Sequence, residues 1–242
     1  MLFHGECADE IFAGYPWFFR EDALNSNTFP WSIALKERQN LLNNDIAKKI
    51  NLIEYIDYRY NESLANVKIL ETDSKETANK RKISYLTMNW FMQTLLDRAD
   101  KMSMQSGLEI RVPFCDYRIV EYLWNIPWEI KALNGREKGL LRYVVRDILP
   151  EEIVDRKKSP YPKTHNPNYL SIVREKLKKI VYDKNAPINN LLDRDCIINI
   201  IETEGKSFSR PWFGQLMTLP QLMAYLIQVN MWLEKYKPEI II

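Results

Sequence analysis

Gly5-Glu6-Cys7-Ala8-Asp9-Glu10-Ile11-Phe12-Ala13-Gly14-Tyr15 is the stretch of this sequence that says most about its fold. The short apolar run before it, residues 1–3, is typical of the end of a buried strand. Ala8 to Phe12 resemble the start of a helix with acids in its first turn. In α/β proteins, ligands bind where a strand ends in a turn and a helix begins. The alternative is that the acids only complement the helix dipole, worth ~0.3–1 kcal/mol each.

The strand predicted at residues 1–3 needs partners, because unpaired backbone groups are costly when buried. The rest of the chain offers almost no other strand pattern. The sequence therefore predicts that the sheet partners of this strand lie outside the chain, and that the chain begins in the middle of a domain.

Composition is that of a soluble globular protein, with 242 residues of which 46% are hydrophobic and 27% charged. The net charge of +2 gives no reason to expect nucleic acid or a membrane surface as a partner. No apolar run reaches the ~20 residues that span a bilayer, and no signal peptide or glycine-rich phosphate loop is recognisable. The three cysteines are widely spaced, which predicts neither a metal site nor a disulfide framework and favours a reducing, cytoplasmic compartment.

Apolar periodicity predicts a mainly helical chain. The helices are expected at 30–42, 50–67, 75–103, 117–124, 137–149, 168–182, 193–204 and 212–236, with a further turn at 150–156. Ser74 and Asp116 are predicted N-caps, and Pro220 is expected to bend the last helix. Residues 109–114 look extended, and the proline-rich stretch 159–167 looks like a loop. Two weak linker candidates are 72–74 and 183–190.

A second group of charged residues lies at 96–104 and 107–116, at the end of an apolar helix and on the extended segment after it. Asp97 and Lys101 are four residues apart, which predicts an ordinary helix-face pair. Glu109 and Arg111 share one face of the extended segment and are expected to pair with neighbours.

A third group, residues 150–162, carries three consecutive bases, Arg156, Lys157 and Lys158, before the prolines. Such a run is most often solvated surface. In a loop it can also reach over a bound polyphosphate.

Together and in this order, the three segments resemble the synthetase half of glutamine-dependent asparagine synthetases. The first is similar to the family's S-G-E-G-A-D-E-x-F-x-G-Y, the second to L-x-R-x-D-[RK]-x-S-M…G-L-E-x-R-V-P-F-x-D, and the third to L-P-x-x-I-x-x-R-K-K…P. Arg142, within residues 138–142, fits the family's K-x-x-L-R. The resemblance is clearest over residues 1–162, whereas 163–242 shows only helical periodicity.

The resemblance implies a fold and its place in it. The family's synthetase domain is an ATP-pyrophosphatase fold (adenine nucleotide alpha hydrolase-like), a parallel sheet with helices. Residues 1–242 would be its mainly α, helical C-terminal portion, with most of the sheet upstream. The family's S-G-G-x-D-S loop and N-terminal glutaminase domain do not occur in this sequence. We therefore expect the chain to act with an upstream glutaminase and phosphate-loop half, and to be inactive alone.

The resemblance also implies a reaction and its residues. The family activates aspartate with Mg²⁺ and ATP to a β-aspartyl-adenylate, releases pyrophosphate, and lets glutamine-derived ammonia attack. Glu6 would be a catalytic residue in forming the adenylate and in the ammonia step, and Lys158 would stabilise charge on the leaving pyrophosphate. Asp9 would bind Mg²⁺, which takes one or two carboxylates plus phosphates.

Four more residues are implied in binding. His4 and Gly5 match the backbone stretch that touches ATP, and Asp97 and Arg98 lie toward the substrate in the family. The sequence leaves open whether the protein forms a homo-oligomer.

Three departures from the family pattern stand in the first segment: His4 replaces serine, and Cys7 and Ala13 replace glycines. The glycine at position 7 allows backbone angles that cysteine tolerates poorly. His4 could act as a general base or be a tolerated substitution. Cys7 has no base other than His4, which argues against a nucleophilic role.

Three functions therefore stay open. The first is a part of an asparagine synthetase, which the presence of Glu6 favours. The second is an ATP-dependent amide ligase of a peptide or antibiotic pathway, similar to macrolactam or β-lactam synthetases. The third is a helical remnant without catalysis.

Overall fold

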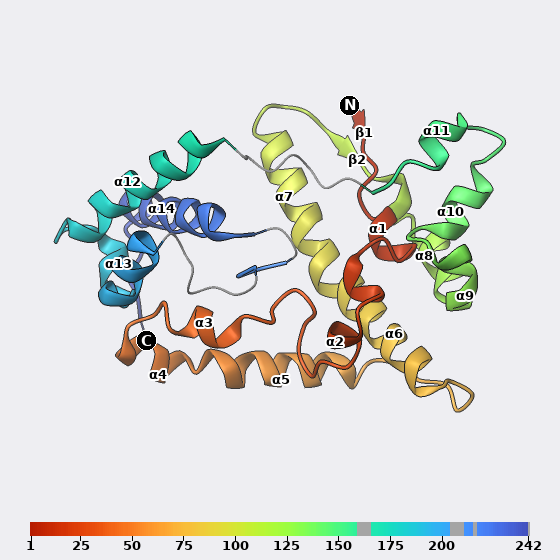
Figure 1. The fold of residues 1–242 in the computed structure, drawn as a ribbon, viewed down its shortest axis with the longest axis horizontal. Helices are drawn as coiled ribbons and strands as arrows, with labels where there is room; N and C mark the ends of the chain where they lie inside the picture. Colours follow the sequence, from red (N-terminus) through yellow and green to blue (C-terminus); the bar gives the residue numbers. More distant parts are fainter. Residues whose placement is uncertain (159–165, 204–210, 215–216, 242) are drawn as a thin grey trace. The chain divides into compact units, whose positions relative to one another are not determined.

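The computed structural model describes residues 1–158, 166–203, 211–214 and 217–241. The chain divides into two units, one of Met1–Ser26 with Glu62–Ser159 and one of Asn27–Asn61 with Pro160–Ile242. Both are built mostly from helices (Figure 1), which confirms the prediction of a mainly α chain. Both predicted linkers, 72–74 and 183–190, lie inside a unit and separate nothing.

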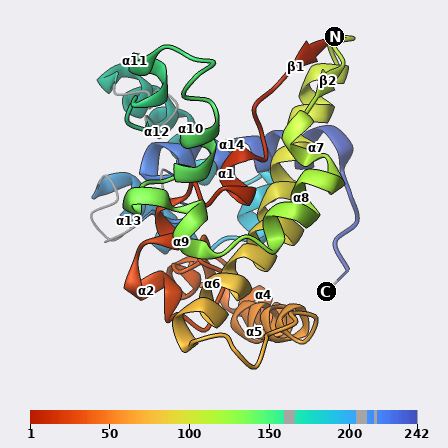
Figure 2. The ribbon, with the colours of Figure 1, turned by 90° about the vertical axis from the view of Figure 1, so that its right-hand side faces the viewer.

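The first unit holds the two strands of the described residues, β1 (Leu2–Phe3) and β2 (Ile110–Arg111). They pair in parallel, with Leu2 opposite Ile110, and they lie side by side near the N-terminus (Figure 2). The N–H of His4 extends the pairing by donating to the Arg111 carbonyl at 2.9 Å. The prediction that every partner of the first strand lies outside the chain is therefore wrong. The partner was hidden because a two-residue strand has too few positions to show alternation.

The first strand leads through a turn into α1 (Ala8–Ile11), as the sequence predicts. The further elements of the unit are η1 (Pro16–Phe18), α2 (Glu21–Leu24), α6 (Lys75–Leu86), the π-helical turn η2 (Thr87–Phe91), α7 (Met92–Met104), η3 (Pro113–Cys115), α8 (Tyr117–Trp124), α9 (Trp128–Lys131), η4 (Leu133–Gly135), α10 (Gly139–Val144) and α11 (Glu151–Val154). Ile11, Phe12 and Leu123 form a buried cluster, which seats α1 against α8.

The long helix predicted at 75–103 is confirmed as the continuous run α6, η2 and α7. Ser74 caps it, accepting a hydrogen bond from the Thr77 N–H at 3.2 Å. Asp116 caps α8 in the same way, and the Arg118 N–H donates to it at 2.9 Å. The π-helical turn was not predicted, because no glycine or proline marks it in the sequence.

Three predicted helices are shorter in the structure. Of 137–149, only α10 is an α-helix, because Lys138 has a left-handed backbone (φ 56°) that ends the preceding turn. Of 30–42, only α3 (Leu35–Gln39) is helical, after a turn in which the Ser32 N–H donates to the Phe29 carbonyl. Of 212–236, α14 (Leu219–Tyr236) begins seven residues late. Pro220 lies in its first turn, where its missing N–H is not needed, so the predicted bend there is wrong.

The second unit consists of α3, α4 (Asn44–Ile50), most of α5 (Leu52–Leu64), α12 (Pro167–Tyr182), η5 (Pro187–Asn190), α13 (Arg194–Glu202) and α14. Leu177, Ile197 and Met223 are fully buried where α12, α13 and α14 pack together. The helices predicted at 50–67, 168–182 and 193–204 are confirmed, whereas most of the loop predicted at 159–167 lies outside the described residues. Across the described part of the chain, no helix is both long and apolar enough to cross a bilayer.

Candidate functional site

The first unit brings Glu6 and Arg98 together, as the sequence hypothesis requires of two residues of one site. Glu6 lies in the turn between β1 and α1, and its side chain is 10% exposed. Arg98, from the middle of α7, donates to Glu6 Oε1 at 3.1 Å. In the described part of the chain, the arginine partner of this nearly buried carboxylate is therefore itself half exposed.

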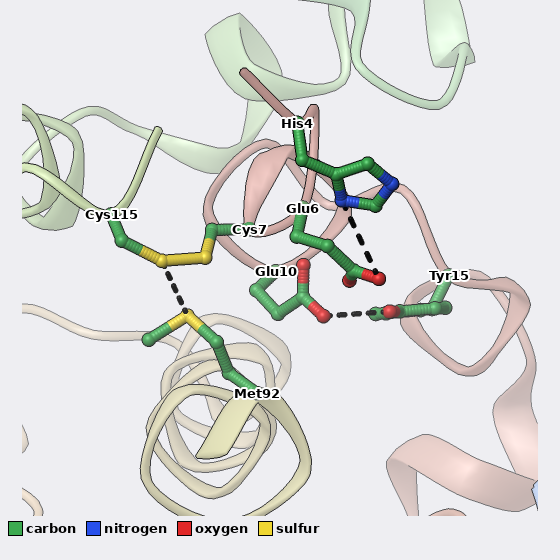
Figure 3. The surroundings of a disulfide bond; sticks show 7 residues. All are labelled: His4, Glu6, Cys7, Glu10, Tyr15, Met92 and Cys115. Atoms are coloured by element: carbon green, nitrogen blue, oxygen red, sulfur yellow. Dashed lines mark hydrogen bonds and ion pairs between the residues drawn. A yellow bond between two sulfur atoms is a disulfide. The ribbon is translucent and has the colours of Figure 1, made fainter. Parts of the chain in front are cut away.

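His4 lies beside the same carboxylate (Figure 3), with 3.8 Å between His4 Nδ1 and Glu6 Oε1. That distance is too long for a hydrogen bond. His4 Nδ1 is buried and has no hydrogen-bond partner among the described residues. The structure therefore places the predicted ATP-contact residue next to Glu6 without fixing its imidazole.

A second acid of this stretch, Glu10, is part of the scaffold. It is 2% exposed, and the Tyr15 hydroxyl donates to its Oε1 at 2.6 Å. Burial raises the pKa of Glu10, although the Tyr15 hydrogen bond opposes the rise. The same burial, together with the charge of Glu10, raises the pKa of Tyr15. The hydrogen bond between Tyr15 and Glu10 links α1 to the turn at Gly14 and Tyr15.

A disulfide joins Cys7 to Cys115 (Figure 3), with 5.7 Å between their Cα atoms. Met92 Sδ, on α7, lies 3.9 Å from Cys115 Sγ. The prediction that the cysteines form no disulfide is wrong for this pair. Their 108-residue separation hid it, since only the pairing of β1 with β2 brings the two segments together. Because the Cys7 sulfur is bonded and fully buried, it is no nucleophile here.

Cys7 and Ala13, which stand where the family has glycines, both have the left-handed backbone conformation that glycine favours. Cys7 has φ 77° and Ala13 has φ 59°. For residues with a Cβ, the left-handed region costs roughly 1–2 kcal/mol. The segment around Asp9 therefore has a strained backbone at both ends, Cys7 and Ala13. The disulfide fixes the Cys7 end.

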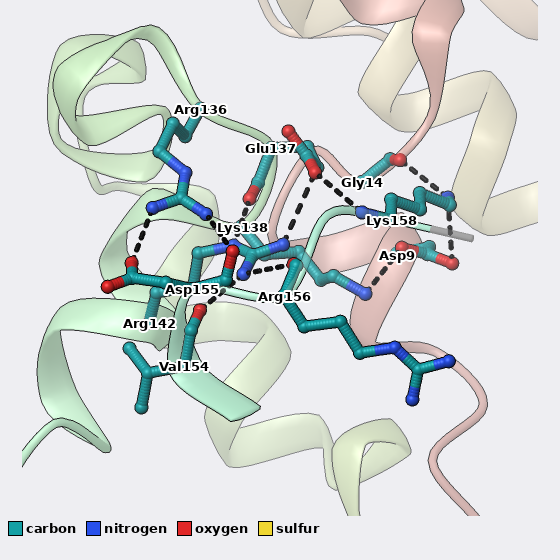
Figure 4. Close-up of polar contacts among 10 residues, drawn as sticks. All are labelled: Asp9, Gly14, Arg136, Glu137, Lys138, Arg142, Val154, Asp155, Arg156 and Lys158. Atoms are coloured by element: carbon teal, nitrogen blue, oxygen red, sulfur yellow. Dashed lines mark hydrogen bonds and ion pairs between the residues drawn. The ribbon is translucent and has the colours of Figure 1, made fainter. Parts of the chain in front are cut away.

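Asp9, on α1, lies between two lysines from the far end of the unit (Figure 4). Lys138 Nζ is 3.0 Å from Asp9 Oδ1, and Lys158 Nζ is 3.0 Å from Oδ2. Lys158 Nζ also donates to the Gly14 carbonyl at 2.6 Å and lies 4.6 Å from the centre of the Tyr15 ring. The acidic turn and the basic segment of the sequence thus meet at one carboxylate.

Gly14 permits this meeting. A Cβ at Gly14 would lie 1.8 Å from Asp9 Oδ1 and 2.7 Å from Asp9 Cα, which no side chain could tolerate. Gly5 differs, because a Cβ there would meet no atom within 4 Å. Open space above Gly5 leaves room for a ligand to approach the backbone.

The sequence hypothesis did not single out Lys138, and it named Asp97 both as a helix-face partner of Lys101 and as a residue near the substrate. Lys138 is the lysine of the K-x-x-L-R match, so the signal was present, but only Arg142 was singled out. Asp97 pairs with Lys101 on the exposed face of α7 at 2.7 Å, the ordinary pair that its spacing predicts. It has no contact with Glu6 or Asp9, unlike its neighbour Arg98.

The acids of the site fit a divalent cation poorly as they stand. Among the described residues, no three His, Cys, Asp or Glu side chains cluster as metal ligands. Asp9 is a hard oxygen donor of the kind Mg²⁺ prefers, but both of its oxygens already face lysine ammonium groups. A Mg²⁺ ion at Asp9 would therefore have to displace a lysine.

Comparison with known proteins agrees with the three sequence motifs. The family model described as asparagine synthase matches residues 1–234. Asparagine synthetase [glutamine-hydrolyzing] 3 of Bacillus subtilis is 51% identical over 236 residues, which are 98% of this chain and 38% of the relative. Asparagine synthetase [glutamine-hydrolyzing] 1 of the same species is 30% identical over 132 residues, 54% of this chain and 21% of the relative.

A human asparagine synthetase [glutamine-hydrolyzing] is 42% identical over 67 residues, which are 26% of this chain and 12% of the relative. The chain thus spans less than half the length of these curated relatives. With the family model matching residues 1–234, this chain belongs to the asparagine synthase family.

Proposed function

We propose that this chain provides part of the reaction site of a glutamine-dependent asparagine synthetase. The whole enzyme would couple ATP to the amidation of aspartate, through a β-aspartyl-adenylate that ammonia attacks. The observation that carries the proposal is the meeting of Lys158 with Asp9, next to the turn that presents Glu6. The names of the relatives support the same reaction.

Lys158 would act on the departing pyrophosphate. Its side chain is 27% exposed and its ammonium is held by Asp9 and the Gly14 carbonyl, so it is already placed before substrate binds. In adenylation, negative charge develops on the leaving group, and a preorganised cation aimed at it lowers the barrier. Lys138, which faces the other oxygen of Asp9, would offer a second cation to the same phosphates.

Glu6 would serve the ammonia step. A carboxylate near an attacking ammonia can accept its proton. Arg98 would hold the Glu6 carboxylate in place through its hydrogen bond, and the neighbouring His4 and Gly5 would contact ATP. Asp97 would act in substrate binding only if Lys101 released it.

ATP and aspartate belong to this proposal as substrates, and glutamine as the source of ammonia. Mg²⁺ belongs to it as the usual companion of ATP phosphates, with Asp9 its carboxylate ligand only after a lysine has moved away. The phosphate loop and glutaminase would come from an upstream half, attached to an ATP-pyrophosphatase sheet. Leu2 and Phe3, 47% and 64% exposed although they form β1, support further strands beside this pair.

A cytoplasmic location stays a prediction, as does the possibility of a homo-oligomer. No observation favours a macrolactam or β-lactam type of acceptor over aspartate. The non-catalytic alternative predicts that the ion pairs of Asp9 with Lys138 and Lys158 only stabilise the fold.

Grafting tests the proposal. In asparagine synthetase [glutamine-hydrolyzing] 3 of Bacillus subtilis, the aligned segment is replaced by this chain. Asparagine and pyrophosphate are then measured with ATP, aspartate and ammonia. We expect equal amounts of both products, dependent on aspartate, and no product from the isolated chain. A well-folded grafted protein without activity, beside an active parent enzyme, would refute the proposal.

A further inference from the structure

The segment that carries Lys158 is held in place by one short stretch of chain, residues 136–142 (Figure 4). The segment follows α11 and has no regular structure of its own from Asp155 to Lys158. Without secondary structure, its backbone carbonyls need partners from elsewhere. Two guanidinium groups of the 136–142 stretch donate to these carbonyls, and one carboxylate of the stretch accepts from the Lys158 backbone N–H.

Arg142 makes most of these contacts. Its Nη1 donates to the carbonyls of Val154 and Arg156, the latter at 2.9 Å. Its Nε donates to the Glu137 carbonyl at 3.0 Å, and Nη2 lies 3.2 Å from Glu137 Oε1. The side chain of Arg142 is only 14% exposed, so water competes weakly for these carbonyls.

Glu137 links the Arg142 side chain to the backbone of Lys158. Its Oε1, which Arg142 holds, lies 3.4 Å from the Lys158 backbone N–H. Burial raises the pKa of Glu137, but the N–H groups it accepts from and the charges of Arg142 and Arg136 outweigh this and lower the pKa overall. Glu137 therefore stays a carboxylate, able to accept from both Arg142 and Lys158.

Arg136 holds the same segment at Asp155, the residue between the two whose carbonyls Arg142 binds. Its Nη1 donates to Asp155 Oδ1 at 2.6 Å and its Nη2 to the Asp155 carbonyl at 3.1 Å. This pair is about 40% exposed on each side, so it is the weaker contact. The three consecutive carbonyls of residues 154–156 are thus all taken by arginines.

We propose that Arg142 is a positioning residue, which, with Glu137, fixes the backbone at Lys158 so that the Lys158 ammonium reaches Asp9 and the leaving pyrophosphate. Arg142 touches no substrate. It acts through the planar fork of its guanidinium, which binds two carbonyls and Glu137 at once, a geometry that a lysine ammonium cannot reproduce. The catalytic part of this inference rests on the proposed function, whereas the geometric part does not.

The geometric part is tested on the chain itself by acylating lysines with a small water-soluble reagent and following each lysine by mass spectrometry. In the unaltered chain we expect Lys158 to react several-fold more slowly than the exposed Lys157. Arg142→Gln should bring Lys158 close to the rate of Lys157. The matched control is Arg146→Gln, because Arg146 is exposed and has no side-chain contact in the described part of the chain. An unchanged Lys158 rate in Arg142→Gln would overturn the proposal.

Lys131 reports on folding in the same experiment, since it is 8% exposed and is not among the residues to which Arg142 donates hydrogen bonds. If Arg142→Gln also exposes Lys131, the milder Arg142→Lys carries the test, and we expect faster labelling of Lys158 with Lys131 still protected. Exposure of Lys131 in both variants would contradict a local role and make Arg142 a residue of the fold as a whole.

The catalytic part is tested in the grafted enzyme. Arg142→Gln should lower kcat for pyrophosphate release at least tenfold and leave the KM for aspartate within twofold, while Arg146→Gln changes neither. A rise in the KM for aspartate with kcat preserved would contradict the inference. If the unaltered grafted enzyme is inactive, the proposed function fails, and the labelling result still decides the positioning role.

Discussion

Lys158 Nζ lies 3.0 Å from Asp9 Oδ2, although the two residues stand at opposite ends of the first unit's sequence. Asp9 comes from a four-residue helix, and Lys158 from an irregular segment held by arginines. The two parts that resemble family motifs are thus joined by a contact that neither motif contains. The contact fixes a cation beside the acidic turn before any substrate arrives.

Asp9→Asn should release both lysines, because a neutral amide attracts ammonium groups far less than a carboxylate does. We expect acylation of Lys138 and Lys158 to rise several-fold, with at most about 1 kcal/mol lost from the free energy of unfolding, since the pairs are partly exposed. Asp147→Asn, an exposed change, is the control. Lysine rates unaffected by Asp9→Asn would show that the ion pairs do not hold these side chains.

Gly14→Ala should destabilise the acidic turn, because the new methyl group would overlap Asp9. Overpacking of this kind typically costs about 1–3 kcal/mol. Gly5→Ala is the matched control, since its methyl group would meet open space. Thermal unfolding midpoints of the two variants check this, and equal midpoints would mean that Gly14 and Asp9 do not approach so closely.

The sequence predicted the helical class better than the arrangement of the segments in space. Periodicity identified the run from α6 to α7, and cap residues located Ser74 and Asp116, because these signals are local. The pairing of β1 with β2 and the disulfide between Cys7 and Cys115 depend on segments far apart in the chain. No local pattern encodes such contacts.

Proline and glycine positions show a second limit. Pro220 was expected inside a helix, but it occupies a first turn, and only the structure shows where that turn begins. At Cys7 the family resemblance did point to unusual backbone angles, and the structure shows a positive φ both there and at Ala13. The K-x-x-L-R match contains Lys138, but only the folded chain shows that Lys138 pairs with Asp9.

Breaking the disulfide should weaken the fold. The bond closes a loop of about a hundred residues, and removing such a bond typically costs about 2–5 kcal/mol. We expect Cys115→Ser, or a reducing agent, to lower the unfolding midpoint by the same amount, with no further effect when the two are combined. Cys196→Ser, which changes the free cysteine, is the control. Insensitivity of the unaltered chain to reduction would contradict a stabilising disulfide.

Lys131→Met should stabilise the chain at pH 7. Lys131 is buried, and burial with the nearby charge of Arg81 lowers its pKa to about 8 from an ordinary 10.5. Between these two values the unfolded chain holds a proton that the folded chain has released. Stability should therefore rise as pH increases from about 8 to about 10.5, by roughly 3 kcal/mol at most.

Urea unfolding at several pH values measures this effect. In Lys131→Met the rise above pH 8 should vanish, whereas the exposed change Lys75→Met should leave it intact. A rise of the same size in Lys131→Met would assign the pH dependence to another group.

The most direct test of the central claim compares Lys158→Ala with Lys157→Ala in the grafted enzyme. Aspartate-dependent pyrophosphate release is measured under saturating ATP. If Lys158 is the preorganised cation at the leaving group, its loss should slow the reaction on the order of a hundredfold, or roughly 3 kcal/mol. Lys157, exposed and without a side-chain contact in the described residues, should matter less than threefold. Equal rates for the two variants would contradict the account and reduce the basic segment to solvated surface.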